Sequence, residues 1–102
     1  MMTGTTSTLF QIQTLTIDQA RYVASYYRAV SMIHDGPDGL IAAQIAEAAQ
    51  AAVDMEAAWP SKVDPGAMGL TPEGEVAMRA WDAARARCER ASRAADYMMA
   101  RR

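Results

Sequence analysis

The sequence predicts an all-α fold, a three-helix bundle. In it the first helix packs on an antiparallel hairpin of the second and third helices, with an extended N-terminal arm. Two observations predict this fold. Two long segments carry apolar residues at an unbroken 4-3-4-3 spacing, with alanine at many of these positions. Prolines and glycines gather at the two junctions that separate the helical segments.

The two apolar stripes indicate how the hairpin closes. The first stripe consists of Ile41, Ile45, Ala48, Ala52, Met55 and Trp59. The second consists of Ala77, Trp81, Ala84, Cys88, Ala91, Ala95 and Met98. Small residues let two helix axes approach closely, so we interpret both stripes as the intramolecular core. The alternative is that one of them is a contact between two copies of the chain.

Residues 1–15 are interpreted as the N-terminal arm. Residues 1–8 are rich in threonine, serine and glycine, and we expect them to be partly disordered. Residues 9–15 include β-forming residues with partial alternation, but a single strand has no partner in a helical chain. We therefore expect an extended segment that lies on the core. The alternative is strand pairing with another copy or another protein.

The first helix is expected over residues 17–34. Thr16 and Gln19 have the spacing of a capping box, and Asp18 suits the first turn. The run Asp35-Gly36-Pro37 ends the helix. Its predicted apolar face comprises Val23, Tyr26, Tyr27, Val30, Ile33 and His34. The opposite, polar face comprises Asp18, Arg21, Ser25 and Arg28.

The second and third helices are expected over residues 39–58 and 72–100, which completes a helical domain over 16–102. Asp38 is the predicted N-cap of the second helix, and Trp59-Pro60 ends it. A loop rich in proline and glycine follows over 60–70. Thr71 and Pro72 then open the third helix. Because this helix is longer than its partner, its last turns need cover from the first helix, the arm or a second molecule.

Composition limits the compartment and the class of protein. Apolar residues make up 51% of the chain and charged residues 22%, which is typical of a globular domain. The single cysteine excludes an intramolecular disulfide and suits a reducing compartment. The N-terminus lacks the pattern of a signal peptide, and no apolar run is long enough to span a membrane. We therefore expect a cytoplasmic protein with no membrane contact.

No catalytic motif is present, and we expect that the protein is not an enzyme. The sequence has no glycine-rich phosphate loop, no nucleophile elbow and no metal-ligand spacing. The only histidine, His34, is interpreted as a cap for carbonyl groups at the end of the first helix. Cys88 lies on the alanine stripe and is interpreted as an inert buried thiol. No cofactor and no metal are therefore expected.

The charges are unevenly distributed. Residues 35–75 hold eight acids and one base, whereas residues 76–102 hold seven arginines and three acids. Arg87 and Arg90 have no acid three or four residues away on their own helix, so they suggest either partners on the acidic second helix or binding of nucleic acid or nucleotide phosphate. A helix-turn-helix is rejected because the second helix has no lysine or arginine. The acidic middle segment is too sparse to favour mimicry of nucleic acid.

The leading hypothesis is a small interaction protein that binds and regulates, or inhibits, a larger protein partner. We expect it to be a homodimer or higher homo-oligomer. A phage or mobile-element inhibitor of a host defence would fit the size by analogy alone. The candidate contact residues are Tyr22, Tyr26, Arg87, Arg90, Tyr97 and Met98. Nucleic-acid or nucleotide-phosphate binding through the arginines of the third helix remains the alternative.

Overall fold

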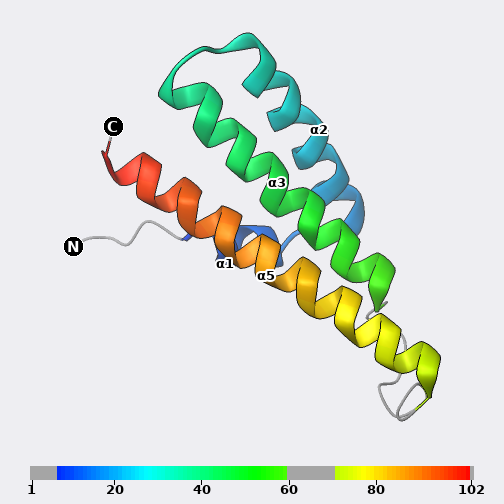
Figure 1. Ribbon diagram of the computed structural model, residues 1–102. Coiled ribbons are helices and arrows are strands. Elements are labelled where there is room, and N and C mark those ends of the chain that lie inside the picture. Colours follow the sequence, from blue (N-terminus) through cyan, green and yellow to red (C-terminus); the bar gives the residue numbers. More distant parts are fainter. Residues whose placement is uncertain (1–6, 60–70, 102) are drawn as a thin grey trace.

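The computed structural model describes residues 7–59 and 71–101, and within them the chain forms four α-helices and no strand (Figure 1). The helices are α1 (Thr8–Gln13), α2 (Ile17–Ile33), α3 (Pro37–Ala58) and α5 (Pro72–Arg101). The prediction of an all-α protein is therefore confirmed for this part of the chain. Of the predicted disorder over residues 1–8, residues 1–6 lie outside the described residues, as does the predicted loop over 60–70; for Thr8 the prediction was wrong, because this residue is helical and buried.

The first difference from the sequence prediction is α1. We expected an extended segment over residues 9–15, but Thr8–Gln13 is helical. The Ser7 side chain caps this helix by accepting a hydrogen bond from the backbone N–H of Phe10 at 3.2 Å. Ile12 is only 4% exposed and lies in the core cluster, with Leu9 packed against that cluster. The spacing of Leu9 and Ile12 is thus helical, and the apparent alternation was misleading.

A carboxylate from the far end of the chain holds α1 in place. Asp96 of α5 accepts two hydrogen bonds from Thr8, one from its backbone N–H at 3.1 Å and one from its hydroxyl at 2.6 Å. Thr8 is itself buried, so the carboxylate satisfies polar groups that water cannot easily reach. This contact fixes the start of α1 against α5.

Replacing Asp96 with alanine is expected to lower the free energy of unfolding by about 1–2 kcal/mol, because both Thr8 donors lose a charged acceptor. Urea denaturation measures this loss, and hydrogen exchange of residues 8–13 should become faster. Asp82→Ala is the matched control, since Asp82 is exposed on the same helix. Equal effects of the two substitutions would show that Asp96 does not anchor α1.

The junction between α2 and α3 depends on Gly36. The predicted capping box of α2 is present, with both the Thr16 and the Gln19 side chains bonded to the backbone. Gly36, with φ of 79° and ψ of −154°, is the N-cap of α3, and Pro37 is its first residue. The prediction that Asp38 is the N-cap was therefore wrong by two residues. Only glycine adopts this backbone conformation without strain, and proline suits the first helical position.

The three long helices lie in a row with α3 in the middle. α2 and α5 both run antiparallel to α3 and pack along it, rather than along each other, while α1 contacts α3 and α5 (Figure 1). The first turns of α5 extend past the end of α3, whereas the sequence predicted that its last turns would outrun the shorter helix (Figure 1). At the start of α5, the Thr71 side chain accepts a hydrogen bond from the Gly74 N–H at 3.0 Å, as expected of the predicted N-cap.

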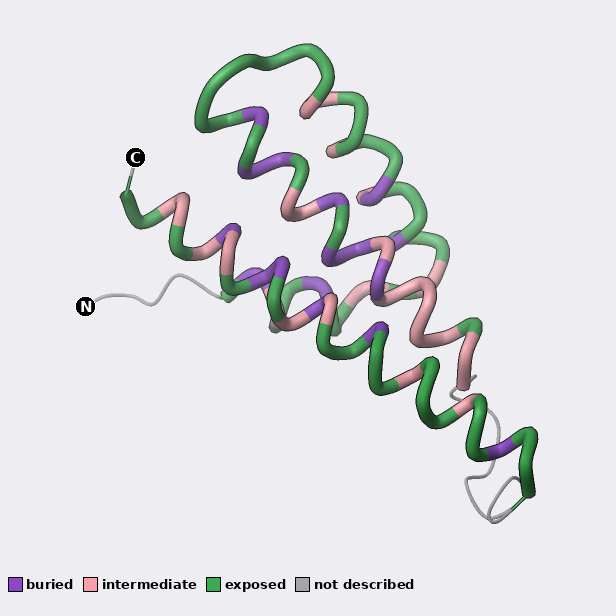
Figure 2. The backbone as a smooth tube through the Cα atoms, viewed as in Figure 1, coloured by how far each residue is buried: buried purple, intermediate pink, exposed green. Residues whose placement is uncertain are grey.

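Because α3 is central, it buries a wider surface than one stripe. The buried residues of α3 are Gly39, Ile41, Ala42, Ala46, Ala48, Ala49 and Ala51, and Figure 2 shows buried positions on successive turns of this helix. At 100° per residue they form two adjoining stripes. Of the six residues of the predicted stripe on this helix, only Ile41 and Ala48 are buried. On α5, which packs on one side, the predicted members Ala84, Cys88, Ala91 and Ala95 are all buried.

The buried face of α2 differs from the predicted one. Ala20 and Ala24 are its two buried residues. The predicted face included Tyr26 and Ile33, which are 51% and 76% exposed. The helix is rotated by roughly a quarter turn from the predicted orientation. The reason is that small residues allow α2 to approach the alanine surface of α3 closely, whereas tyrosines would hold the two helices apart.

Candidate functional site

An apolar stripe runs along the outer side of α2. It consists of Tyr22, Tyr26, Ala29 and Ile33, all of which are exposed, and we call it the tyrosine stripe. Their 4-3-4 spacing places them within about 60° of one another on the helix, on the side opposite Ala20 and Ala24. α2 therefore has two apolar faces, and only one of them packs against the rest of the described structure.

The aromatic rings at this stripe contact one another. The Tyr22 and Tyr26 rings are stacked with their centroids 6.1 Å apart, and Tyr26 meets the half-buried Tyr27 edge to face at 5.2 Å. Such contacts restrict the rotamers of the exposed rings before any partner binds. Tyrosine buries a large area at a small entropic cost, which is why it is common in binding surfaces. The stripe is therefore partly preorganised for binding.

Arg87, one of the predicted contact residues, is already engaged within the molecule. From α5 its guanidinium donates to Asp54 Oδ2 at 2.8 Å and to Glu47 Oε1 at 2.5 Å, both on α3. The hydrogen bond to Glu47, followed by that to Asp54, raises the pKa of Arg87 above its ordinary value. The pairing between Arg87 and the acidic helix was one of the two sequence interpretations, and a phosphate would have to displace both carboxylates.

Arg87→Met is expected to lower the free energy of unfolding by about 0.5–1.5 kcal/mol, because it leaves Glu47 and Asp54 without their shared cation. The Arg87 side chain is 37% exposed, so the loss should shrink as salt is added. Chemical denaturation at low and high salt measures both effects. The matched control is Arg90→Met, since Arg90 is exposed and makes no ion pair among the described residues. If both variants lost the same free energy of unfolding, the ion pairs of Arg87 with Glu47 and Asp54 would not stabilise the fold.

The six predicted contact residues do not form one site. Tyr22 and Tyr26 lie on the outside of α2, whereas the other four lie on α5, which packs on the other side of α3. On α5, Tyr97 is exposed with the Arg101 guanidinium 4.4 Å from the centre of its ring, and Met98 is half-buried. Sequence analysis missed Ala29 and Ile33 as part of the exposed stripe. The 4-3-4 spacing from Tyr22 was the signal that would have found them.

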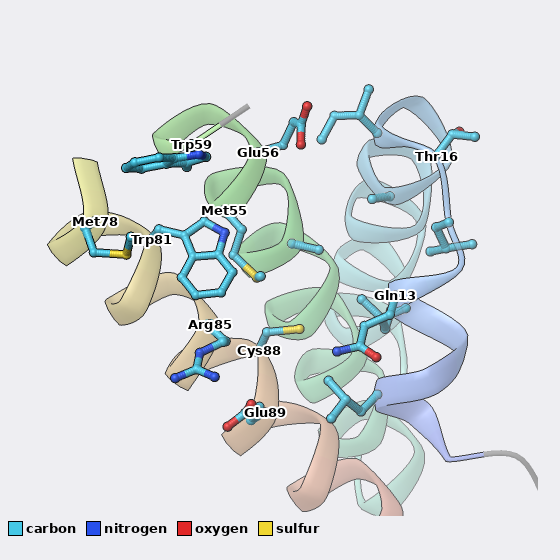
Figure 3. Close-up of a pocket in the computed structure, with 16 residues that line it drawn as sticks. Gln13, Thr16, Met55, Glu56, Trp59, Met78, Trp81, Arg85, Cys88 and Glu89 are labelled. Carbon is cyan, nitrogen blue, oxygen red and sulfur yellow. The ribbon is translucent and has the colours of Figure 1, made fainter. Parts of the chain in front are cut away.

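A pocket of about 750 Å³ opens where α1 and the start of α2 face the C-terminal half of α3 and the N-terminal half of α5 (Figure 3). Trp59 of α3 and Trp81 of α5 line it together with Met55 and Met78. These two tryptophans are the only ones in the chain. The sequence pattern places Trp59 and Trp81 on the two apolar stripes that close the hairpin. It gave no sign of a pocket, since α1 was not predicted to be a helix.

Cys88 also lines this pocket and is buried, as expected of an inert thiol. Burial raises the pKa of Cys88, the Ser92 hydroxyl opposes that increase, and the charge of Glu89 adds to it. Ser92 Oγ is fully buried and has no hydrogen-bond partner of good geometry in the described structure, so its interaction with the thiol is weak. The folded protein therefore disfavours the thiolate.

This shift predicts a stability change at high pH. Unfolded chains lose the thiol proton above about pH 8.5, while the folded protein keeps it until a higher pH. The contribution of the Cys88 thiol to the free energy of unfolding is constant below the pKa of the unfolded chain. It falls as the pH rises from there towards the higher pKa of the folded protein. Between pH 8 and pH 10, the wild type should lose stability relative to Cys88→Ala, by up to about 1.4 kcal/mol per pH unit. Urea denaturation across this range tests it, and parallel pH profiles would contradict it.

The described residues contain neither a metal-binding cluster of histidine, cysteine and acids nor a helix long and apolar enough to cross a membrane. Comparison with models of known protein families, with curated proteins and with solved structures finds no match.

Proposed function

We propose that this chain is a small interaction protein that binds and regulates a larger protein, and that the tyrosine stripe of α2 is its contact surface. The observation that carries the proposal is the pair of apolar faces on α2. Ala20 and Ala24 already bury the inner face, so the fold does not need Tyr22, Tyr26 and Ile33. Exposing large apolar side chains in a row costs solubility, and such rows are typical of binding surfaces.

The chemistry of the stripe favours a protein partner over a nucleic acid. The four side chains carry no charge, and tyrosine is enriched in the energetic centres of protein interfaces. Their 4-3-4 spacing is that of a helix that packs along another helix or in an apolar groove. The arginines of α5 support phosphate binding less well, because Arg87 is held by Glu47 and Asp54.

Two single substitutions test the stripe. Tyr26→Asp and Ile33→Asp place a charge in its centre and at its end, and both residues are exposed, so the fold should tolerate them. Ala86→Asp is the matched control, since it adds the same charge at an exposed position of α5. Affinity purification from the cell that naturally makes the protein should recover a partner with the wild type and with Ala86→Asp. Each stripe variant should bind that partner at least about 30-fold more weakly.

The outcomes separate the candidate functions. Recovery of the same proteins by all four forms would contradict the proposal. A complex that weakens steeply as salt rises from 50 mM to 200 mM would indicate phosphate contacts, whereas an apolar interface should change little. If the stripe joins two copies of this chain, light scattering will show a dimer that Ile33→Asp dissociates, and the proposal of a different partner would then fail.

A further inference from the structure

The pocket between α1, α3 and α5 has the size and the lining of a binding site for a small molecule. Its volume of about 750 Å³ is within the usual range for such sites. Trp59, Trp81, Met55 and Met78 form one end of it, and the labelled indole rings lie on neighbouring helices with the thioethers beside them (Figure 3). Branched aliphatic side chains of α1 and the start of α2, among them Ile12 and Ile17, line the opposite wall.

The charged groups at the pocket select the kind of ligand. Among the described residues of the lining, Glu56 and Glu89 contribute carboxylates and Arg85 contributes a cation. Arg85 lies at the Trp81 wall of the pocket, with its guanidinium 5.3 Å from the centre of that ring, and the Asp82 carboxylate 4.0 Å away offsets part of its charge. Glu89 is half-buried and makes no hydrogen bond or ion pair with any described residue. Among the described residues of the lining, Glu89 is therefore the carboxylate that can pair with a positive charge on a ligand.

From this geometry we infer that the pocket binds a small apolar molecule that carries one positive charge. The indole rings and thioethers surround the apolar body, and the faces of the tryptophan rings attract a cation, as Arg85 over Trp81 shows within the chain itself. The carboxylate of Glu89 supplies the counter-charge. An anion of the same shape would be repelled by the Glu89 carboxylate. This inference concerns a different part of the molecule from the tyrosine stripe and does not depend on it.

Three compounds with one hydrocarbon cage separate shape from charge: 1-adamantanemethylamine, 1-adamantanemethanol and 1-adamantanecarboxylate. Both tryptophans of the chain line the pocket, so the intrinsic fluorescence of the intact protein reports its occupation directly. We expect a saturable change in emission with the amine at pH 7, at an affinity at least about tenfold higher than for the carboxylate, with the alcohol between them. No saturable change with the amine, or binding of the carboxylate as tight as that of the amine, would overturn the inference.

Two variants locate the binding. Ala52→Phe fills the pocket from the α3 side and should abolish the response to the amine, whereas Ala86→Phe, at an exposed position of α5, should leave it unchanged. Glu89→Gln tests the charge without changing the shape, and its circular dichroism should match the wild type. It should weaken binding of the amine about three- to tenfold and leave the alcohol unaffected. Equal effects on amine and alcohol, or none on either, would contradict the assigned role of Glu89.

Discussion

Gly39→Ala is expected to destabilise the protein by about 2–3 kcal/mol, which corresponds to a fall in Tm of roughly 10–20 °C. A Cβ atom at Gly39 would lie 2.1 Å from the carbonyl oxygen and 3.1 Å from the carbonyl carbon of His34. Both are backbone atoms at the end of α2, so no side chain can move aside to make room. Alanine has the higher helix propensity, by about 1 kcal/mol, and this gain offsets only part of the clash.

Thermal denaturation followed by circular dichroism measures this loss. Leu40→Ala is the matched control, because Leu40 is 60% exposed in the same helical turn and its truncation should change stability by less than about 0.5 kcal/mol. A Tm for Gly39→Ala equal to that of the wild type would show that the start of α3 does not approach the end of α2 as closely as the structure has it.

Ala91→Leu is expected to cost about 1–3 kcal/mol, because Ala91 is 3% exposed in the core cluster that also holds Ala48 and Cys88. A leucine there needs three further carbon atoms between two helices that approach closely on small residues. Ala84→Leu, at a second buried position on the same face of α5, should behave in the same way.

The control for these two substitutions is Ala86→Leu, at an exposed position on the same helix. Alanine and leucine differ little in helix propensity, so this substitution should change the free energy of unfolding by less than about 0.5 kcal/mol. Urea denaturation of the three variants gives the comparison. If Ala91→Leu and Ala84→Leu were both as stable as the control, α3 and α5 would not be closely packed along alanine.

The segments that became α2, α3 and α5 were predictable because their signals are local. A capping box at Thr16 and Gln19, the sequence Asp35-Gly36-Pro37 and a threonine-proline start at residue 71 are each read within a few residues of sequence. The stripe on α5 was predictable as well, since that helix packs on one side only and its buried residues follow a single spacing.

What the sequence could not predict depends on which helix lies in the centre. The row of alanines on α3 fits one neighbour or two, and only the tertiary arrangement shows that α2 and α5 share it. That choice rotates α2, buries Ala24 and exposes Tyr26 and Ile33. The anchor between Thr8 and Asp96 joins residues 88 positions apart, and without it the short α1 had no visible reason to be helical.

The same arrangement connects the fold to the proposed function. Because alanines provide the close packing on both sides of α3, larger apolar residues of α2 remain on the surface. The chain therefore folds without the tyrosine stripe and presents it in a fixed geometry, with the Tyr22 and Tyr26 rings stacked. One face of α2 therefore packs on α3, and we propose that the opposite face binds the partner.

Site-specific photocrosslinking tests whether the outer face of α2 contacts the partner. p-Benzoylphenylalanine is introduced at Tyr22 of α2 or at Tyr97 of α5, two aromatic residues that are 69% and 60% exposed, in the cell that naturally makes the protein. We expect a covalent adduct with one defined protein from position 22 and none from position 97. An adduct from position 97 alone, or none from either position while the protein is bound to its partner, would contradict it.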